Sequence, residues 1–340
     1  MNHQILPTMN LYTVIVYVLP AGAHQVEEIE AENATAAVVQ DYGIRFSLLN
    51  DRVHASFSRY TTDYRRVPTT ILRSGATNMS THRLAILTAM NREVGGAMWN
   101  GTDPHWADST TVLYGINDLA SRGYETTLTA NPTRNWRITA NLSHQETKSS
   151  NFGEKEARWL EEVAKAYFNA NPQYRSILTG SGLQNSNETI AQRLEDMQTV
   201  LSLAQTLSGK ANARQPQNSA NLITGYDLTE GRLKGLGVGA TYKWRQRTIL
   251  GYAYVSGRTD LFDTSRVFYG DPTHNVGAFV YYRFKKRGTS ARIQLNVEGL
   301  NDDDRLHPYS AVDRGDGTAY VSRYSVGPGR TFALTTTFDF

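Results

Sequence analysis

The chain has 340 residues, of which 20% are charged, and its formal net charge at pH 7 is +3. This charge is too small to indicate a nucleic-acid partner. The absence of cysteine excludes disulfide bridges, thiolate nucleophiles and zinc–cysteine sites. No stretch approaches the ~20 consecutive apolar residues that a membrane-spanning helix needs.

The first 40 residues allow more than one interpretation. Residues 11–19 are apolar and residues 21–23 are small, as in a secretory signal peptide. However, residues 1–10 contain no Lys or Arg, and the apolar run includes Thr and Tyr. We therefore favour an edge strand or an irregular loop, and we treat 1–40 as an N-terminal segment of uncertain structure.

From residue 42 onward, nine segments alternate apolar and polar residues with the period of a β-strand. They begin near residues 42, 53, 124, 136, 220, 236, 276, 291 and 330. The last segment ends the chain on an aromatic residue, Phe340. Four short turns alternate strictly with four long connections, which span about 63–120, 146–217, 246–274 and 300–328.

This pattern predicts an all-β fold, an antiparallel transmembrane β-barrel with apolar residues outward and polar residues inward. The short turns would face the periplasm and the long loops the outside of a bacterial outer membrane. A charge on the lipid face costs about 2–4 kcal/mol, and the strand charges fall on the polar face instead. A soluble β-sandwich would show the same alternation but would not need loops of this length always on one side.

We expect the long loops to be partly helical. Helices are predicted over 80–94 and 154–170, and a third from the 3.6-residue stripe Ile190, Leu194, Met197, Leu201 and Ala204. Asn187 would cap the third helix and Gly209 would stop it. The two helices of the 146–217 loop could simply pack together as a lid-like loop, or they could form a dedicated surface for a ligand or partner.

Other motifs are weak. Asp313–Thr318 lacks the alternating ligands of a calcium loop, so turn chemistry explains it. Asn301–Asp304 could hold a cation loosely, and Lys285–Arg287 reads as a basic periplasmic turn rather than a nucleic-acid site. The sequence predicts no resident metal, no cofactor and no catalytic constellation.

Several stretches resemble the C-terminal portion of TonB-dependent outer-membrane receptors. They are residues 41–53, 121–125 with 135–142, 233–240, and 295–302 followed by 327–332 and a terminal Phe. The resemblance covers about 41–340. It implies a 22-stranded barrel of which this chain is the partial wall, strands 14 to 22, which would explain an odd strand count. The family's N-terminal plug and its short energy-coupling box have no counterpart here.

The resemblance implies a receptor and transporter component, not an enzyme, for uptake of a scarce nutrient such as a ferric siderophore. The implied partners are outer-membrane lipid and the barrel-assembly machinery, which would recognise Phe338 and Phe340. The periplasmic TonB transducer would be a partner only through the missing plug. The lumen-facing transport candidates are Arg45, Glu125, Arg137, Asn141, Asp227, Lys243, Arg283, Arg292, Gln294 and Glu298.

Two alternatives stay open. A passive porin or adhesin would need an even number of strands and a signal peptide. A membrane-embedded hydrolase on a barrel scaffold would need a Ser/His pair near one rim, which the sequence does not place.

Overall fold

The computed structural model describes residues 8–18, 36–69, 79–94, 115–180, 188–286, 289–301, 305–327 and 329–339. Within these ranges, no helix is both long enough and apolar enough to cross a membrane.

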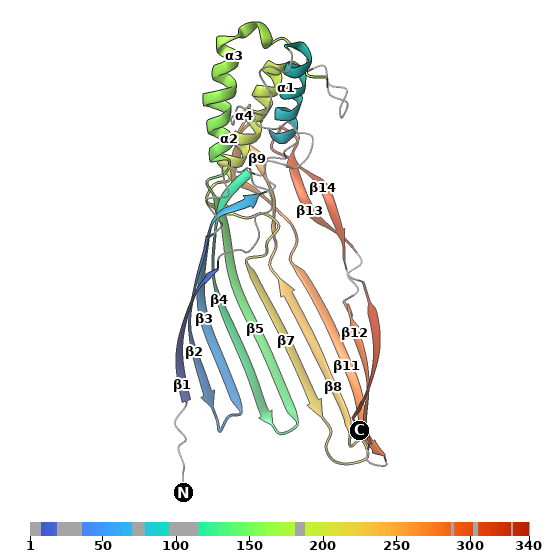
Figure 1. The fold of residues 1–340 in the computed structure, drawn as a ribbon. Coiled ribbons are helices and arrows are strands. Elements are labelled where there is room, and N and C mark those ends of the chain that lie inside the picture. The colour runs from blue at the N-terminus through green and yellow to red at the C-terminus, as the bar shows by residue number, and fades with distance from the viewer. Residues whose placement is uncertain are drawn as a thin grey trace.

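One large curved antiparallel sheet dominates the molecule (Figure 1). Among the described residues it has eleven strands, of which β6 (Lys210–Ala211) lies off the main path, so ten strands follow one another along it. In spatial order these are β1 (Thr8–Val18), β2 (Ala36–Leu48), β3 (Val53–Thr69), β4 (Gly115–Thr133), β5 (Trp136–Ser150), β7 (Asn218–Asp227), β8 (Leu236–Arg245), β11 (Thr273–Lys286), β12 (Thr289–Glu298) and β15 (Thr331–Asp339).

The predicted strand number, nine, is wrong by one, because β1 adds a tenth strand at the edge of the sheet. The edge strand favoured for part of the first 40 residues is therefore confirmed. Its sequence, Val14-Ile-Val-Tyr-Val18, is apolar at successive positions, which removes the period-2 signal that marked the other strands.

The extra strand also changes the side on which the sheet starts, because with nine strands it would have started at the long-loop end. Thr8 pairs with Ser47 beside the first short turn, and Asp339 pairs with Ser290 beside the last. The sheet therefore begins and ends at its short-turn end (Figure 1). Among the described residues β1 and β15 each pair on one side only, so the sheet is an open barrel wall.

The two faces of the sheet differ in chemistry, as the alternation predicts. One face exposes large apolar side chains on successive strands, from Tyr42 on β2 to Phe332 and Leu334 on β15, which are 68% and 73% exposed. The strand register places these on the same face as Phe57, Tyr124, Leu142, Leu222, Tyr226, Val238, Val280, Tyr282, Ile293, Leu295 and Phe338. A contiguous apolar surface of this extent marks contact with lipid or protein.

Glycines on the polar face make room for aromatic rings of the neighbouring strand. A Cβ atom at Gly237 would lie 2.1 Å from the Tyr281 ring, and one at Gly239 would lie 2.2 Å from the Phe279 ring. At Gly239 it would also lie 2.3 Å from the Thr224 carbonyl oxygen. The rings of Phe279 and Tyr281 stack with centroids 6.2 Å apart, so they cover the gap that the glycines leave in the sheet.

The connections between β3 and β4 and between β5 and β6 carry helices that pack together above the long-loop end of the sheet (Figure 1). These are α1 (Met79–Glu93), α2 (Glu154–Arg158), η1 (Trp159–Lys165), α3 (Ala166–Ala170), η2 (Pro172–Tyr174) and α4 (Ile190–Thr206). We call this unit the helical cap. Its own apolar core includes Ile86, Met90, Leu160, Phe168 and Leu201.

All three predicted helices are confirmed, with differences in detail. The helix over 154–170 passes through a π-helical segment, η1. The N-cap of α4 is Thr189, whose Oγ1 accepts from Gln192 N at 3.3 Å while Gln192 Oε1 accepts from Thr189 N at 2.8 Å, a capping box. The predicted cap, Asn187, lies outside the described residues. Gly209 follows the helix with a φ of +73°.

Two long connections contain hairpins that the sequence did not predict. They are β9 (Ile249–Tyr254) with β10 (Phe262–Tyr269), and β13 (Leu306–Asp313) with β14 (Ala319–Val326). Both hairpins have register shifts, and such bulges break the strict alternation by which strands are recognised. We call them the outer hairpins.

Gly239→Ala should destabilise the sheet by about 1–3 kcal/mol, because the new methyl group overlaps both an aromatic ring and a carbonyl oxygen. Urea unfolding of the chain in detergent would measure this loss. Gly180→Ala is the matched control, because nothing lies within 4 Å of a Cβ there. Equal stability of the two variants would show that the ring packing is unimportant.

Candidate functional site

The ten transport candidates lie on the polar face of the sheet, opposite the exposed apolar face. The strand register joins three of them into one lateral row across seven strands. That row is Arg45, Ser56, Thr127, Asn141, Asn221, Lys243 and Asn275. A continuous polar row of this kind is typical of the water-contacting inner wall of a barrel.

Four candidates meet around the buried ring of Tyr281. The Tyr281 hydroxyl donates to Asp227, and Arg283 Nη1 lies 3.3 Å from the same carboxylate. The Arg292 guanidinium stacks 3.9 Å from the ring centroid and donates to Gln294. Since the cluster holds two guanidinium groups and one carboxylate, which pairs with Arg283 alone of the two, this part of the wall carries net positive charge near the short-turn end.

Tyr281 is a residue whose importance the sequence did not reveal. The alternation placed it on the polar face, but an aromatic residue in a barrel strand is more often read as part of the lipid interface. The usable signal was Gly237 and Gly239 on the preceding strand, which leave space for a neighbouring ring.

The remaining candidates are more dispersed. Lys243 Nζ lies 3.2 Å from Glu298 Oε2, an ion pair that reaches across β11. Both side chains are about half exposed, so the pair contributes little to stability. Arg137 and Asn141 make no side-chain hydrogen bond or ion pair with the described part of the chain, which leaves Arg137 available to a ligand.

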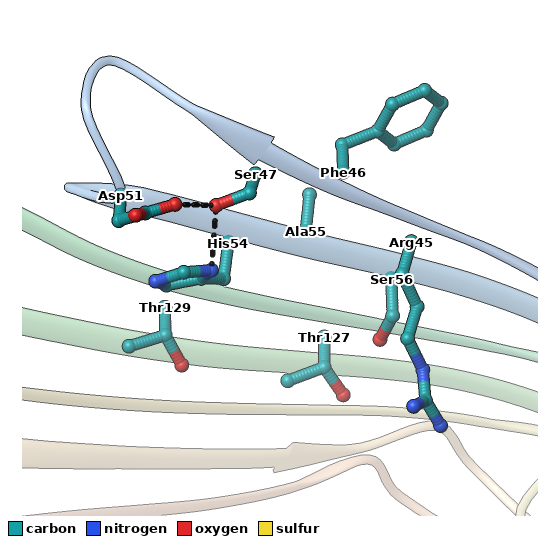
Figure 2. A pocket seen from close by; sticks show the side chains of 9 residues that line it. All are labelled: Arg45, Phe46, Ser47, Asp51, His54, Ala55, Ser56, Thr127 and Thr129. Atoms are coloured by element: carbon teal, nitrogen blue, oxygen red, sulfur yellow. Dashed lines mark hydrogen bonds between the residues drawn. The ribbon is translucent and has the colours of Figure 1, made fainter. Parts of the chain in front are cut away.

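A pocket of about 520 Å³ lies where the polar face meets the first short turn (Figure 2). Arg45, Ser47 and His54 line it, and Phe46 points away from them toward the apolar face. Ser47 Oγ donates to Asp51 and lies 3.2 Å from His54 Nδ1. The structure therefore does place a Ser/His pair near one rim.

This arrangement does not have the order of a hydrolase triad. In a triad the imidazole lies between the serine and the carboxylate, so that it can take the serine proton. Here Ser47 lies between Asp51 and His54, and its hydroxyl donates a hydrogen bond to the carboxylate rather than to the imidazole. The contacts brace the turn, where residues 49–51 all have positive φ.

The outer hairpins are joined by the carboxylate of Asp313. Its Oδ2 accepts from Tyr254 N at 2.7 Å, and its Oδ1 accepts from Gly315 N at 2.8 Å and Gly317 N at 2.9 Å. Partial desolvation opposes ionisation, but these three backbone donors lower the pKa of Asp313. Turn chemistry, as predicted, explains this segment.

The outer hairpins and the segment beside them also bring cations to aromatic faces. The Arg247 guanidinium lies 4.2 Å from the Tyr269 ring centroid, and that of Arg214 lies 5.0 Å from Tyr309. Of the loose cation motif at 301–304, only Asn301 is described. Its side chain already bonds the backbone of Val276 and His274.

A buried polar cluster connects the two long excursions that form the helical cap. His82 on α1 is 2% exposed, and its Nδ1 lies 3.2 Å from Arg193 Nη1 on α4. Arg193 also pairs with Glu188 Oε2 at 2.8 Å. Burial, with Arg193 as the second cause, lowers the pKa of His82 to about 4. Donor atoms of His82, Glu188 and Asp196 lie within 4.8 Å of one another, and the guanidinium supplies positive charge among them.

Comparison with known proteins bears on the fold. No protein-family model and no curated protein sequence matches the chain. The pyoverdine outer membrane receptor FpvA from Pseudomonas aeruginosa matches with a TM-score of 0.51 and 14% identity, over 98% of this chain and 34% of that chain. The ferric-catecholate import receptor Fiu from E. coli gives 0.46 and 16%, over 97% and 32%. The siderophore receptor PiuA from Acinetobacter baumannii gives 0.47 and 13%, over 98% and 33%.

The chain thus spans about a third of the length of the receptors it matches. The likeness to FpvA shows that it has the fold of part of an outer-membrane receptor barrel. This confirms the partial antiparallel barrel that the sequence resemblance implied. The match also extends beyond residues 41–340, to 98% of the chain.

Acid should loosen the helical cap through His82. Because its pKa is lowered from 6.5 to about 4, the neutral imidazole stabilises the cap fully above pH 6.5. That stability is lost as the pH falls from 6.5 toward 4, by at most about 3 kcal/mol. Hydrogen exchange of α1 and α4 amides, corrected for intrinsic rates, would follow the opening.

His82→Asn provides the control, because its amide oxygen can accept from Arg193 at every pH. Glu188 and Asp196 face the same cluster and titrate in both proteins, so the comparison isolates His82. Identical pH profiles for the two proteins would contradict the assignment.

Proposed function

We propose that the chain is part of the wall and the extracellular cap of an outer-membrane receptor that takes up a scarce nutrient. A ferric siderophore is the ligand class, and the role is transport rather than catalysis. The FpvA-like fold supports this proposal, as does the exposed apolar face, which suits contact with lipid. Because the chain spans about a third of such receptors, the activity belongs to the whole receptor.

The observation that carries the proposal is the charge of the polar face. Its positive candidates are Arg45, Arg137, Lys243, Arg283 and Arg292, and its negative candidates are Glu125, Asp227 and Glu298. An excess of positive charge along a confined wall attracts anions and raises their local concentration. Arginine and tyrosine side chains on and beside the outer hairpins, such as Arg247 with Tyr269, would make the first contact with an anionic ligand.

A passive porin or adhesin is the second candidate. The ten strands that the described residues place in the main path make the even count that such a barrel needs, although β1 and β15 do not pair to close it. The helical cap over the long-loop end favours a receptor, because a gated ligand site needs a cover and a passive channel does not. Energised uptake would require TonB, which in the family this chain resembles acts through the plug.

Arg137→Glu should reduce siderophore uptake by the parent receptor by about tenfold, the low end of electrostatic steering effects. Arg137 lies on the polar face without a described ion-pair partner, so its reversal changes the wall charge and leaves packing intact. Uptake of a radioiron-labelled siderophore by whole cells would measure the effect.

Arg134→Glu, in the short turn three residues earlier, is the matched control and should leave uptake unchanged. Unchanged uptake in the Arg137 variant would remove the proposed role of the wall. A panel of ferric siderophores, with cobalamin for comparison, would test the ligand class. A conductance that shows no ligand saturation would favour the porin.

Deleting Phe340 should lower the amount of chain inserted into the outer membrane, because a terminal aromatic resembles the signal read by the barrel-assembly machinery. Phe338 lies on the lipid-exposed face and is 55% exposed, whereas Phe340 lies outside the described residues. Immunoblots of outer-membrane fractions would quantify insertion, with Phe332→Leu on the same face of β15 as the control that keeps both residues of the signal. Normal insertion without Phe340 would leave it as an interfacial residue only.

A further inference from the structure

The apolar face of the sheet ends in a lateral row of aromatic and basic residues on β2 to β5. Register pairs Tyr42 with Arg59, Arg59 with Tyr124, and Tyr124 with His144. The Arg59 guanidinium lies 6.0 Å from the Tyr124 ring centroid, and the rings of Tyr124 and His144 lie 6.1 Å apart. These side chains therefore form one connected strip on the outer surface.

This strip lies at the long-loop border of the apolar band. On β5 the outward residues run from Trp136 near the short turn to His144, eight positions away. At about 3.3 Å per residue this is about 26 Å along the strand. At a strand tilt of about 35–45° it spans roughly 20 Å of height, most of the ~25 Å apolar band of outer-membrane barrels. Phe57 and Leu142, toward the short-turn side of the strip, are exposed and apolar.

Two arginines in this region have no acidic partner. Arg122 pairs with Thr61, two residues beyond Arg59 on β3, so the two arginines are diagonal neighbours on one face. Both are exposed. Within the described residues neither forms an ion pair. The register places Glu146 directly opposite Arg122, but its carboxylate pairs with Lys148 at 3.0 Å instead. Asp63 shares the face and is not joined to either arginine.

We propose that Arg59 and Arg122 bind the phosphate groups of an anionic lipid in the outer leaflet. Guanidinium groups bind phosphate in a bidentate manner. Because Arg59 and Arg122 form no ion pair with the described residues, their N–H groups are available to donate to phosphate oxygens. Tyr42 and Tyr124 suit the boundary between acyl chains and headgroups. A lipid headgroup is the occupant that meets both the charge and the apolar band beside it. This inference rests on the proposed function, because it requires the apolar face to contact lipid.

The test reconstitutes the chain in phosphatidylcholine nanodiscs that contain diphosphorylated lipid A. After extraction into mild detergent, native mass spectrometry counts the lipid A molecules retained by wild type and by R59Q/R122Q. Loss of both charges should weaken retention about 30-fold, on the typical contribution of a basic residue near an anionic surface. The matched control, R134Q/R232Q, removes two arginines from short turns at the opposite end of the sheet and should retain lipid A like wild type.

The outcomes separate the inference from the function on which it rests. If wild type enters nanodiscs but R59Q/R122Q and R134Q/R232Q retain lipid A equally, the lipid site is refuted and the barrel proposal stands. If wild type does not enter nanodiscs at all, the proposed function fails with it. If R59Q/R122Q does not fold, the single variant R122Q decides, because the Arg122 side chain makes no described contact and its loss should not affect folding. A drop in lipid A retention of about fivefold supports the site, and unchanged retention overturns it.

Discussion

A strand that crosses a membrane has no water available for its backbone N–H and C=O groups, so its neighbours in the sheet must bond them. This constraint organises the molecule. It requires long antiparallel strands in unbroken lateral succession, and it leaves side chains to alternate between lipid and lumen. The exposed aromatics of one face, such as Tyr282 and Phe332, and the charged residues of the other, such as Arg283 and Arg292, follow from the same period of two, because each neighbour along a strand must suit the opposite environment.

The strength of this alternation explains how much of the fold could be predicted from sequence. Strands β8 and β12 were predicted because their alternation is regular. In β8 Val238 lies on the apolar face and Gly239 on the polar face, and in β12 the same holds for Ile293 and Arg292. The prediction failed where the alternation is absent or interrupted. β1 is apolar at successive positions, and the outer hairpins contain bulges, so neither gave a signal of period two.

The candidate site was predicted in part for the same reason. Alternation places Asp227, Arg283 and Arg292 on one face, but it does not say which residues meet across strands. Their meeting depends on register, and on Gly237, which lets the Tyr281 ring lie flat over the sheet as Gly239 does for the Phe279 ring stacked beside it. The cluster of His82 with Arg193 was beyond prediction, since 111 positions separate the two residues and their contact exists only because two separate excursions pack together.

The two edges of the wall have a consequence of their own. β1 and β15 each bond a neighbour on one side, and the other side of each carries a row of unsatisfied donors and acceptors among the described residues. Such an edge is a template for any strand of suitable length. To extend the antiparallel sheet, an added strand must run antiparallel to the edge strand. Its apolar side chains must fall on the apolar face and its polar side chains on the polar face. The pairing register of each edge strand therefore restricts which strands can add to it.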